Sequence, residues 1–123
     1  MRFSANLGFL WADRSLPEAI RAAAAAGFDA VECHWPYDAP TQAVRAALRE
    51  TGLPMLSLNT RRGDVDAGEN GLAALPGREA EARAAIDEAL GYAAAIGAGM
   101  AHVMAGRASG PEAERAFAGN LAY

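Results

Sequence analysis

Two kinds of apolar segment alternate along this 123-residue chain. Short runs that contain β-branched or aromatic residues lie at 3–9, 29–34, 54–59 and 100–104, and each is followed by a longer Ala-rich stretch. Short runs of this kind are typical of buried strands, whereas the Ala-rich stretches repeat with the period of a helix. The sequence therefore predicts the order βαβαβαβα, in which helical crossovers make neighbouring strands parallel.

Capping and stop signals delimit the predicted helices. They are capping boxes at 15–18 and 109–112, a cap at Asp38 for a helix over 39–51, and stops at Gly27, Gly52 and Gly97. Apolar residues at helical spacing predict the inward faces. These are Val44 and Leu48, then Ile86, Leu90 and Ala94, and finally Phe117 and Leu121.

Two architectures of the α/β class fit this order, an open doubly wound sheet and a closed (β/α)₈ barrel. A closed barrel has eight units and about 250 residues, and this chain provides four units. The last helix carries no stop signal and its apolar stripe continues to the end, so we expect further chain to follow.

Polar residues interrupt the predicted strands, although both faces of a parallel sheet are normally covered by apolar layers. They are Asn6, Glu32, His34, Asn59 and His102, each at or near the carboxyl end of its strand. Barrel enzymes place their active sites at this end. A local hydrogen bond can explain any one of them. Comparable positions on four strands favour a ligand site, and we predict that these residues bind substrate.

A long Gly-rich segment, 60–77, follows the third predicted strand and is expected to fold over the mouth of the barrel. Arg61 and Arg62 lie at its start and Arg78 directly follows it, and planar guanidinium groups match the geometry of a substrate carboxylate or phosphate. Solvated surface charge is the alternative for each arginine. Arg61 is included among the predicted substrate-binding residues.

Charge and cysteine content exclude several classes of function. The formal net charge is -4 without a cluster of Lys and Arg, which disfavours nucleic acid and membrane partners and leaves a small molecule as the expected partner. The single cysteine, Cys33, can form no disulfide within the chain. No stretch reaches the roughly 18 apolar residues of a membrane helix. We therefore expect a cytoplasmic protein.

Sequence signals for a metal or nucleotide site are weak. Glu32 and His34 share one face of their strand while Cys33 points to the other, which leaves two metal ligands on one side. Neither the phosphate-binding pattern G-x-x-x-x-G-K-S/T nor a dinucleotide-binding G-x-G-x-x-G after a strand is present. We predict no metal-binding residue in this chain.

Three segments together resemble a known family. They are GFDAVE at 27–32 with Pro36-Tyr37-Asp38, the segment 59–79 that ends in LPGRE, and HVMAG at 102–106. In order they cover essentially the whole chain, and LPGRE is the most specific. They resemble the hydroxypyruvate isomerase family, which includes 2-oxo-tetronate isomerases, within the xylose-isomerase-like barrels. The resemblance implies a parallel (β/α) barrel of TIM-barrel type, with 1–123 as the N-terminal half of one (β/α)₈ domain, the first four βα units of eight.

The resemblance also implies an intramolecular isomerase that interconverts small hydroxy-keto and hydroxy-aldehyde acids, such as hydroxypyruvate and tartronate semialdehyde, through an enediolate. In this family glutamates act as acid and base beside a divalent ion, Mg or Mn, and these residues lie in the second half of the barrel. We therefore expect catalytic residues beyond Tyr123, no cofactor in this chain alone, and an inactive fragment.

Several alternatives remain open. The pair His34-Trp35 departs from the family, whose members tend to have apolar residues before Pro-Tyr-Asp, so the exact substrate is undecided. The nearest rival is another enzyme of the superfamily, a sugar epimerase or an inositol-pathway enzyme. A DNA-repair endonuclease is disfavoured by the net charge. A non-catalytic half barrel is a further alternative, and its open strand edge is expected to produce a homo-oligomer.

Overall fold

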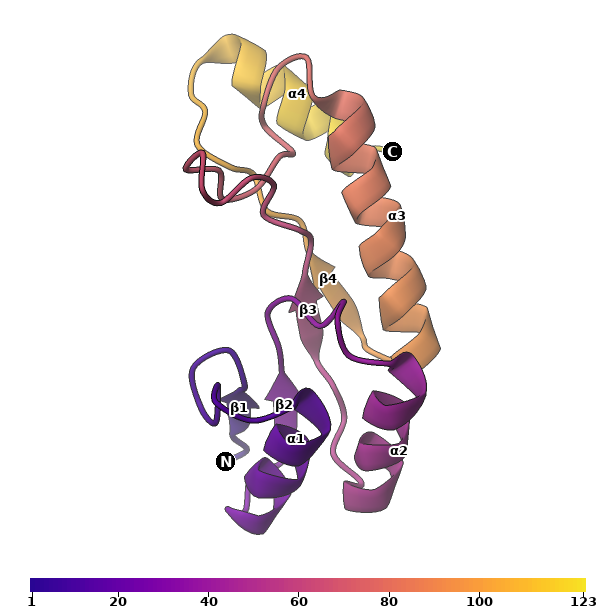
Figure 1. Cartoon of the computed structure of the whole chain (residues 1–123). Coiled ribbons are helices and arrows are strands. Elements are labelled where there is room, and N and C mark those ends of the chain that lie inside the picture. Colours follow the sequence, from indigo (N-terminus) through magenta and orange to yellow (C-terminus); the bar gives the residue numbers. More distant parts are fainter. The chain divides into compact units, whose positions relative to one another are not determined.

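The computed structural model describes residues 1–123, and its elements alternate as the sequence predicts (Figure 1). The strands are β1 (Ser4–Asn6), β2 (Ala30–Glu32), β3 (Ser57–Asn59) and β4 (Met100–His102). The helices are α1 (Leu16–Ala25), α2 (Thr41–Thr51), α3 (Glu79–Ile96) and α4 (Pro111–Leu121). The predicted order βαβαβαβα is confirmed, although each strand is shorter than its apolar run.

The chain divides into two compact units. The first comprises Met1–Leu58 and Gly91–Ala101, and the second comprises Asn59–Leu90 and His102–Tyr123. Each unit is thus assembled from two segments that are distant in the sequence.

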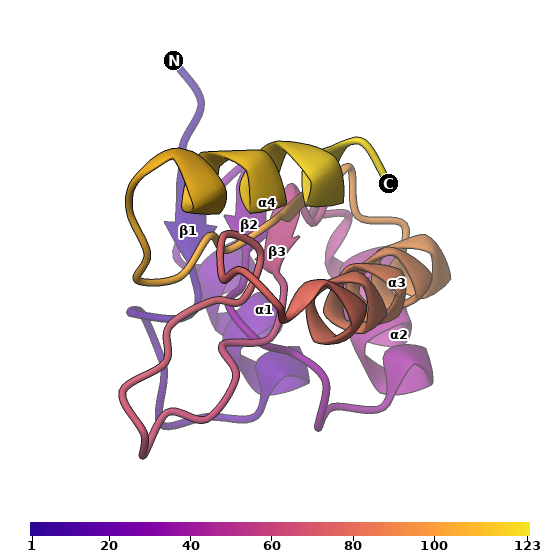
Figure 2. The same cartoon turned by 90° about the horizontal axis from the view of Figure 1, so that it is seen from above.

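In the first unit, β1 and β2 pair in parallel with Ala5 opposite Val31. The segment before and into β3 continues the pairing, because Val31 N donates to Pro54 O at 3.0 Å and Leu56 N donates to Val31 O at 2.8 Å. Figure 2 shows β1, β2 and β3 side by side. The helices α1 and α2 contact each other, and their side chains Ile20 and Val44 are fully buried. These residues form the apolar core of the unit.

The hydrogen-bonded strands make two two-stranded sheets, β1-β2 and β3-β4. A single parallel bridge between Val31 and Met55 joins the first pair to the segment that leads into β3. The α/β class and the parallel β1-β2 pair are therefore observed. The arrangement as half of a barrel stays a prediction.

Most predicted helix ends are confirmed. Ser15 precedes α1, and its backbone N–H donates to the Glu18 carboxylate at 3.1 Å, which is the Glu18 half of the capping box. Gly27 and Gly52 follow α1 and α2 with φ of 86° and 73°. Because a side chain is disfavoured at positive φ, glycine ends a helix at such a position.

Two predicted caps are wrong. Pro40, and not Asp38, is the N-cap of α2, which begins at Thr41. The N-cap of α4 is Gly110, which has no side chain to cap the helix, so the predicted capping box at 109–112 does not form. The cap of α2 thus lies two residues after Asp38, and the cap of α4 lies one residue after Ser109, directly before Pro111 at the first helical position.

The buried faces of the last two helices also differ from the predicted stripes. On α3, Ile86 is buried as predicted, but Leu90 is 55% exposed and Ala94 is exposed. On α4 the buried residues are Ala113, Ala116 and Asn120, whereas Leu121 is exposed. The buried face of α3 combines alanines with Ile86, Tyr92 and Ile96, whereas that of α4 consists of two alanines and Asn120. On α2 the predicted inward residues Val44 and Leu48 are buried.

In the second unit, the segment 60–78 is bound to the chain that follows β4. Gly71 and Ala105 form an antiparallel bridge, and Leu72 N and Ala73 N both donate to Met104 O at 3.2 Å. The buried side chain of Asn120 donates through Nδ2 to Ala73 O at 2.8 Å and so attaches α4 to this segment. Residues 71–74 of the segment are therefore part of the unit's core, whereas residues 63–68 are exposed.

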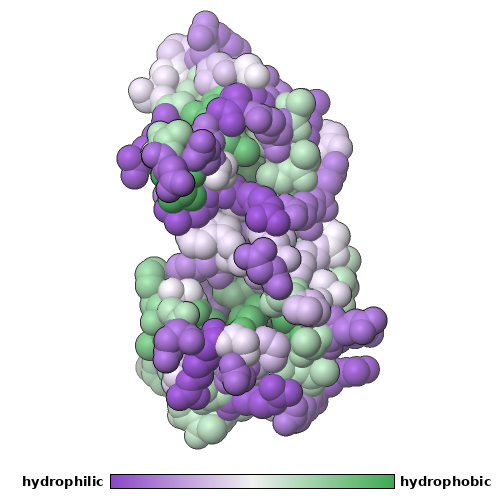
Figure 3. Space-filling view, viewed as in Figure 1, coloured by the Kyte–Doolittle hydropathy of each residue, from purple (hydrophilic) through white to green (hydrophobic).

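The surface mixes hydrophilic and hydrophobic residues on the face that Figure 3 shows, with a hydrophobic hollow in the part of the molecule where Figure 1 labels β2 and α1. None of the helices combines the length and the apolar character that crossing a membrane requires.

Candidate active site

Two of the predicted site residues, Asn6 and Glu32, stand opposite each other at the carboxyl ends of β1 and β2. Asn6 Oδ1 accepts a hydrogen bond from Gly8 N at 2.9 Å. Glu32 Oε2 accepts one from the Ser57 hydroxyl at 3.3 Å. Both side chains are half-buried. The structure thus places these polar groups together, and it gives Asn6 a local role in closing the turn after β1.

His34 lies just beyond β2 and is held between aromatic rings. The Phe9 ring meets it edge-on at a centroid distance of 4.9 Å, and the Trp35 ring lies at 5.0 Å. Gly8 lies directly against the imidazole, because a Cβ atom at that position would stand 2.1 Å from His34 Nδ1. The absence of a side chain at Gly8 therefore creates the space that the imidazole occupies.

A cavity of about 550 Å³ opens beside His34 in the first unit. Its walls come from the residues after β1, from the first turn of α1, and from the residues between β2 and α2, and they include Leu7, Leu16, Cys33 and Pro36. A volume of this size lies within the range of small-molecule sites. Among the predicted site residues only His34 lines it.

Cys33 is buried in the wall of this cavity, where removal from water disfavours the thiolate and raises the thiol's pKa to about 12, with a smaller contribution from Glu32. We expect the native thiol to react with iodoacetamide at pH 8 about 100-fold or more slowly than the unfolded chain, because only the thiolate is nucleophilic. Mass spectrometry after timed quenching, with and without urea, measures this. Equal rates in both conditions would show that the thiol is accessible.

Asn59 and His102 come together at the carboxyl ends of β3 and β4, as the sequence predicts for residues of neighbouring strands. Asn59 Oδ1 and His102 Nδ1 are 3.2 Å apart. Thr60, which the sequence analysis did not single out, joins the same two segments. Its backbone N–H donates to His102 O at 2.9 Å, and its Oγ1 accepts from Met104 N at 2.9 Å. A threonine after a strand carries no distinctive sequence signal, so only the tertiary structure identifies it.

Arg61 pairs with a carboxylate of its own unit. Its Nε and Nη2 donate to Glu88 of α3 at 2.7 and 2.9 Å, a bidentate arrangement. Both side chains remain about half exposed, at 50% and 41%. A substrate carboxylate would have to compete with Glu88 for this guanidinium. Arg62 donates through Nε to Asn70 Oδ1 at 2.9 Å within the same segment.

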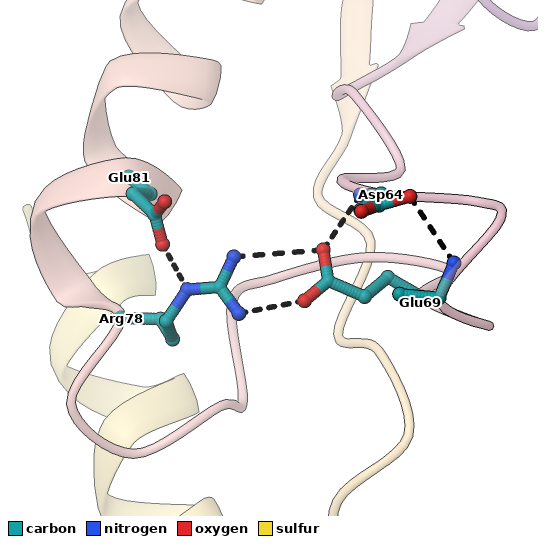
Figure 4. Close-up of polar contacts among 5 residues, drawn as sticks. Asp64, Glu69, Arg78 and Glu81 are labelled. Atoms are coloured by element: carbon teal, nitrogen blue, oxygen red, sulfur yellow. Dashed lines mark hydrogen bonds and ion pairs between the residues drawn. The ribbon is translucent and has the colours of Figure 1, made fainter.

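Figure 4 shows the ion network that orders the segment 60–78. The Glu69 carboxylate accepts from Arg78 Nη1 at 2.6 Å and from Asp64 N at 2.6 Å. Arg78 Nε also contacts Glu81 on α3. Gly63 makes room for this network, since a Cβ atom there would stand 2.2 Å from Glu69 Oε2. The network ties the middle of the segment, at Asp64 and Glu69, to its end at Arg78.

Glu69 should make the stability of this segment dependent on pH. Hydrogen bonds from Arg78 and then from Asp64 N lower its pKa from the ordinary value of 4.5. A carboxyl group with a lowered pKa stabilises the folded state above that value, and the stabilisation is lost as the pH falls through the lowered pKa. Urea unfolding of wild type and Glu69→Gln should therefore differ at pH 7, and the difference should shrink as the pH falls through the lowered pKa. Glu81→Gln, which leaves the bond to Asp64 intact, is the matched control with a smaller effect. A difference that stays constant as the pH falls would contradict this role.

Comparison with known proteins identifies the family of the chain. Residues 20–123 match a family described as xylose isomerase-like TIM barrel. The chain belongs to the xylose isomerase-like TIM barrel family. It is 47% identical over 108 residues to a Homo sapiens protein named "putative hydroxypyruvate isomerase", an alignment that covers 87% of this chain and 39% of that protein. It is 48% identical over 105 residues to a 2-oxo-tetronate isomerase of Cupriavidus necator, covering 85% of this chain and 40% of that protein. The resemblance found in the sequence is therefore confirmed.

A solved structure of the same kind supports the fold. The chain superposes on the AP endonuclease, family 2, from Brucella melitensis with a TM-score of 0.89 and 37% sequence identity. The superposition covers 98% of this chain and 48% of that protein. Like the alignments with the isomerases, it shows that this xylose isomerase-like chain spans less than half the length of the proteins it matches.

Proposed function

We propose that this chain is part of an isomerase that interconverts small hydroxy-keto and hydroxy-aldehyde acids of the hydroxypyruvate or 2-oxo-tetronate type. The observation that carries the proposal is the identity of 47% and 48% to relatives that bear these names, each over at least 85% of the chain. Polar residues at the carboxyl ends of all four strands support it, because barrel enzymes bind substrate there.

The proposed reaction moves a carbonyl group to the neighbouring carbon. A base removes a proton from the carbon that bears the hydroxyl, the resulting enediolate carries the negative charge on oxygen, and a proton returns to the former carbonyl carbon. Fixed polar groups that face the enediolate oxygens lower the barrier. In our proposal Asn6, Glu32, His34, Asn59 and His102 bind and orient the hydroxyl and carbonyl oxygens, and Arg61 binds the substrate carboxylate.

The residues of this chain do not make a complete site for a divalent ion. No group of three or more His, Cys, Asp or Glu side chains is arranged to hold one. Glu32 at the end of β2 and His34 just beyond it provide two side chains, one fewer than such a group needs. We therefore assign no metal ligand and no metal-dependent step to this chain, and propose that a Mg or Mn ion, where used, is held by residues outside it.

We further propose that residues 1–123 form the first four βα units of an eight-unit barrel and that the acid and base glutamates lie outside them. Coverage of 39% and 40% of the two isomerases supports this, since it leaves more than half of each relative's length outside the match. A chain without the acid and base should bind substrate weakly and turn over none.

The test compares the full-length protein with residues 1–123 alone. Each is incubated with hydroxypyruvate and, separately, with a 2-oxo-tetronate, with and without MnCl₂ or MgCl₂, and products are followed by ¹H NMR in D₂O. The expected result is interconversion, with exchange of the transferred proton for deuterium, by the full-length protein only. Turnover by residues 1–123 alone would overturn the proposal that the acid and base lie outside these residues. A full-length protein inactive on both acids would overturn the proposed substrate class.

A second candidate, cleavage of DNA at abasic sites, has one observation in its favour, the name of the Brucella melitensis protein on which the chain superposes. The net charge of -4 argues against it, because binding to a phosphate backbone relies on clustered Lys and Arg. The full-length protein is expected to leave an abasic-site duplex intact at low salt. Incision of that duplex, together with no isomerase activity, would reverse the ranking.

A further inference from the structure

The orientation of the His102 side chain carries chemical information. Its Nδ1 lies 3.2 Å from Asn59 Oδ1. An amide oxygen can only accept a hydrogen bond, so the ring nitrogen that faces it must carry the proton. In a neutral imidazole the other nitrogen is then bare and acts as an acceptor. Asn59 therefore selects the form of His102 with hydrogen on Nδ1 and a lone pair on Nε2.

Thr60 holds the two segments that bear this pair. Its side chain is 3% exposed, and it bonds the other segment on both sides of residue 103. The backbone N–H of Thr60 reaches His102 O, and its hydroxyl accepts from Met104 N, each at 2.9 Å. These two bonds, from one residue to residues 102 and 104, hold the end of β4 in register with the end of β3. The distance between Asn59 and His102 depends on this alignment.

His102 itself is exposed, in contrast to Thr60, so its Nε2 is available to a ligand. We infer that His102 presents Nε2 as a hydrogen-bond acceptor to a substrate hydroxyl, that Asn59 fixes this form of the ring, and that Thr60 is a positioning residue for the pair. The part that concerns substrate rests on the proposed function. A hydroxy-keto acid supplies a hydroxyl donor next to its carbonyl, and an acceptor there selects the hydroxy acid over a keto acid that lacks the hydroxyl.

The first experiment reads the ring directly and needs no substrate. The full-length protein is labelled with ¹⁵N-histidine, and the His102 signals are assigned by their loss in His102→Gln. At a pH where the ring is neutral, the expected result is a protonated, pyrrole-type Nδ1 and a bare, pyridine-type Nε2. The opposite pattern in the wild type would overturn the inference.

Matched variants then test the two supporting residues. Asn59→Leu removes the acceptor, and Thr60→Val removes the hydroxyl at nearly constant volume. In each variant the shifts of His102 Nδ1 and Nε2 should move toward each other, as expected when the two neutral forms of the ring exchange. Thr60→Ser keeps the hydroxyl and should retain the wild-type pattern. Unchanged shifts in Thr60→Val would show that Thr60 positions nothing. If Thr60→Val fails to fold, the other two variants still test the inference. Wild-type nitrogen shifts in Asn59→Leu would contradict it, and so would altered nitrogen shifts in Thr60→Ser.

A kinetic measurement distinguishes this inference from the proposed function. With hydroxypyruvate and full-length protein, Thr60→Val is expected to lower kcat/KM about tenfold, the loss of one well-placed hydrogen bond, and Thr60→Ser to restore most of it. Variants with altered nitrogen shifts but wild-type kcat/KM would refute the substrate contact. If the wild-type protein turns over neither acid, the proposed function fails, while the nitrogen shifts still report on Asn59, Thr60 and His102.

Discussion

Gly106→Ala should lower the free energy of unfolding by about 3 kcal/mol. The reason is the close approach of two backbones in the second unit, where Gly71 pairs with Ala105. A Cβ atom on residue 106 would stand 2.2 Å from Gly71 O, so one of the two segments would have to move. The cost of overpacking adds to the cost of placing alanine at a φ of 91°. Urea unfolding followed by circular dichroism measures the loss.

The matched control is Gly68→Ala in the segment 60–78. Gly68 has a similar φ of 85°, but nothing lies within 4 Å of a Cβ atom there. Its substitution therefore carries the backbone cost alone, about 1 kcal/mol. The difference between the two variants isolates the clash with Gly71. Equal losses in both variants would mean that Gly71 O is too far from residue 106 to clash with a Cβ atom there.

Asn120→Ala is expected to cost about 2 kcal/mol. The Asn120 side chain is 2% exposed, donates to Ala73 O at 2.8 Å, and accepts from Arg83 Nε at 3.3 Å. Truncation leaves a buried carbonyl without its donor, and this desolvation penalty exceeds the net value of an ordinary hydrogen bond. Thermal unfolding by differential scanning calorimetry measures the change.

A neighbouring position provides the control for Asn120. Gly119 lies in the same helix with open space around it, so Gly119→Ala should stabilise the protein by about 1 kcal/mol through helix propensity. The two substitutions have opposite expected signs although they are adjacent in α4. An Asn120→Ala variant as stable as wild type would show that α4 is attached to the segment 60–78 by apolar contacts alone.

Local signals predicted the kinds of element and most helix ends, because these depend on residues close together in the chain. The hydrogen bond from Ser15 N to Glu18 and the positive φ of Gly27 and Gly52 are set within one helical turn. The predictions failed where packing decides. Leu121 was predicted to face inward, yet it is exposed, and α4 instead buries Ala113, Ala116 and Asn120.

The candidate site shows the same division. Residue type and position near strand ends were enough to select Asn59 and His102, since parallel strands bring their carboxyl ends to one edge. Nothing in the sequence showed that Asn59 would select the bonding form of His102 or that Thr60 would align their two segments. Arg61 was selected to bind a substrate carboxylate or phosphate, and the sequence did not show that it pairs with Glu88, 27 residues away on α3.

The sequence by itself determined the alternation of strands and helices, the helix stops, and the family to which the chain belongs. All three depend on periodicity and short patterns, which a linear chain displays directly. Only the tertiary structure decided which face of α3 and α4 is buried, which glycines permit backbones to approach, and which polar side chains meet. Such pairings join residues that are far apart in the chain, so their energies depend on distances that no local pattern contains.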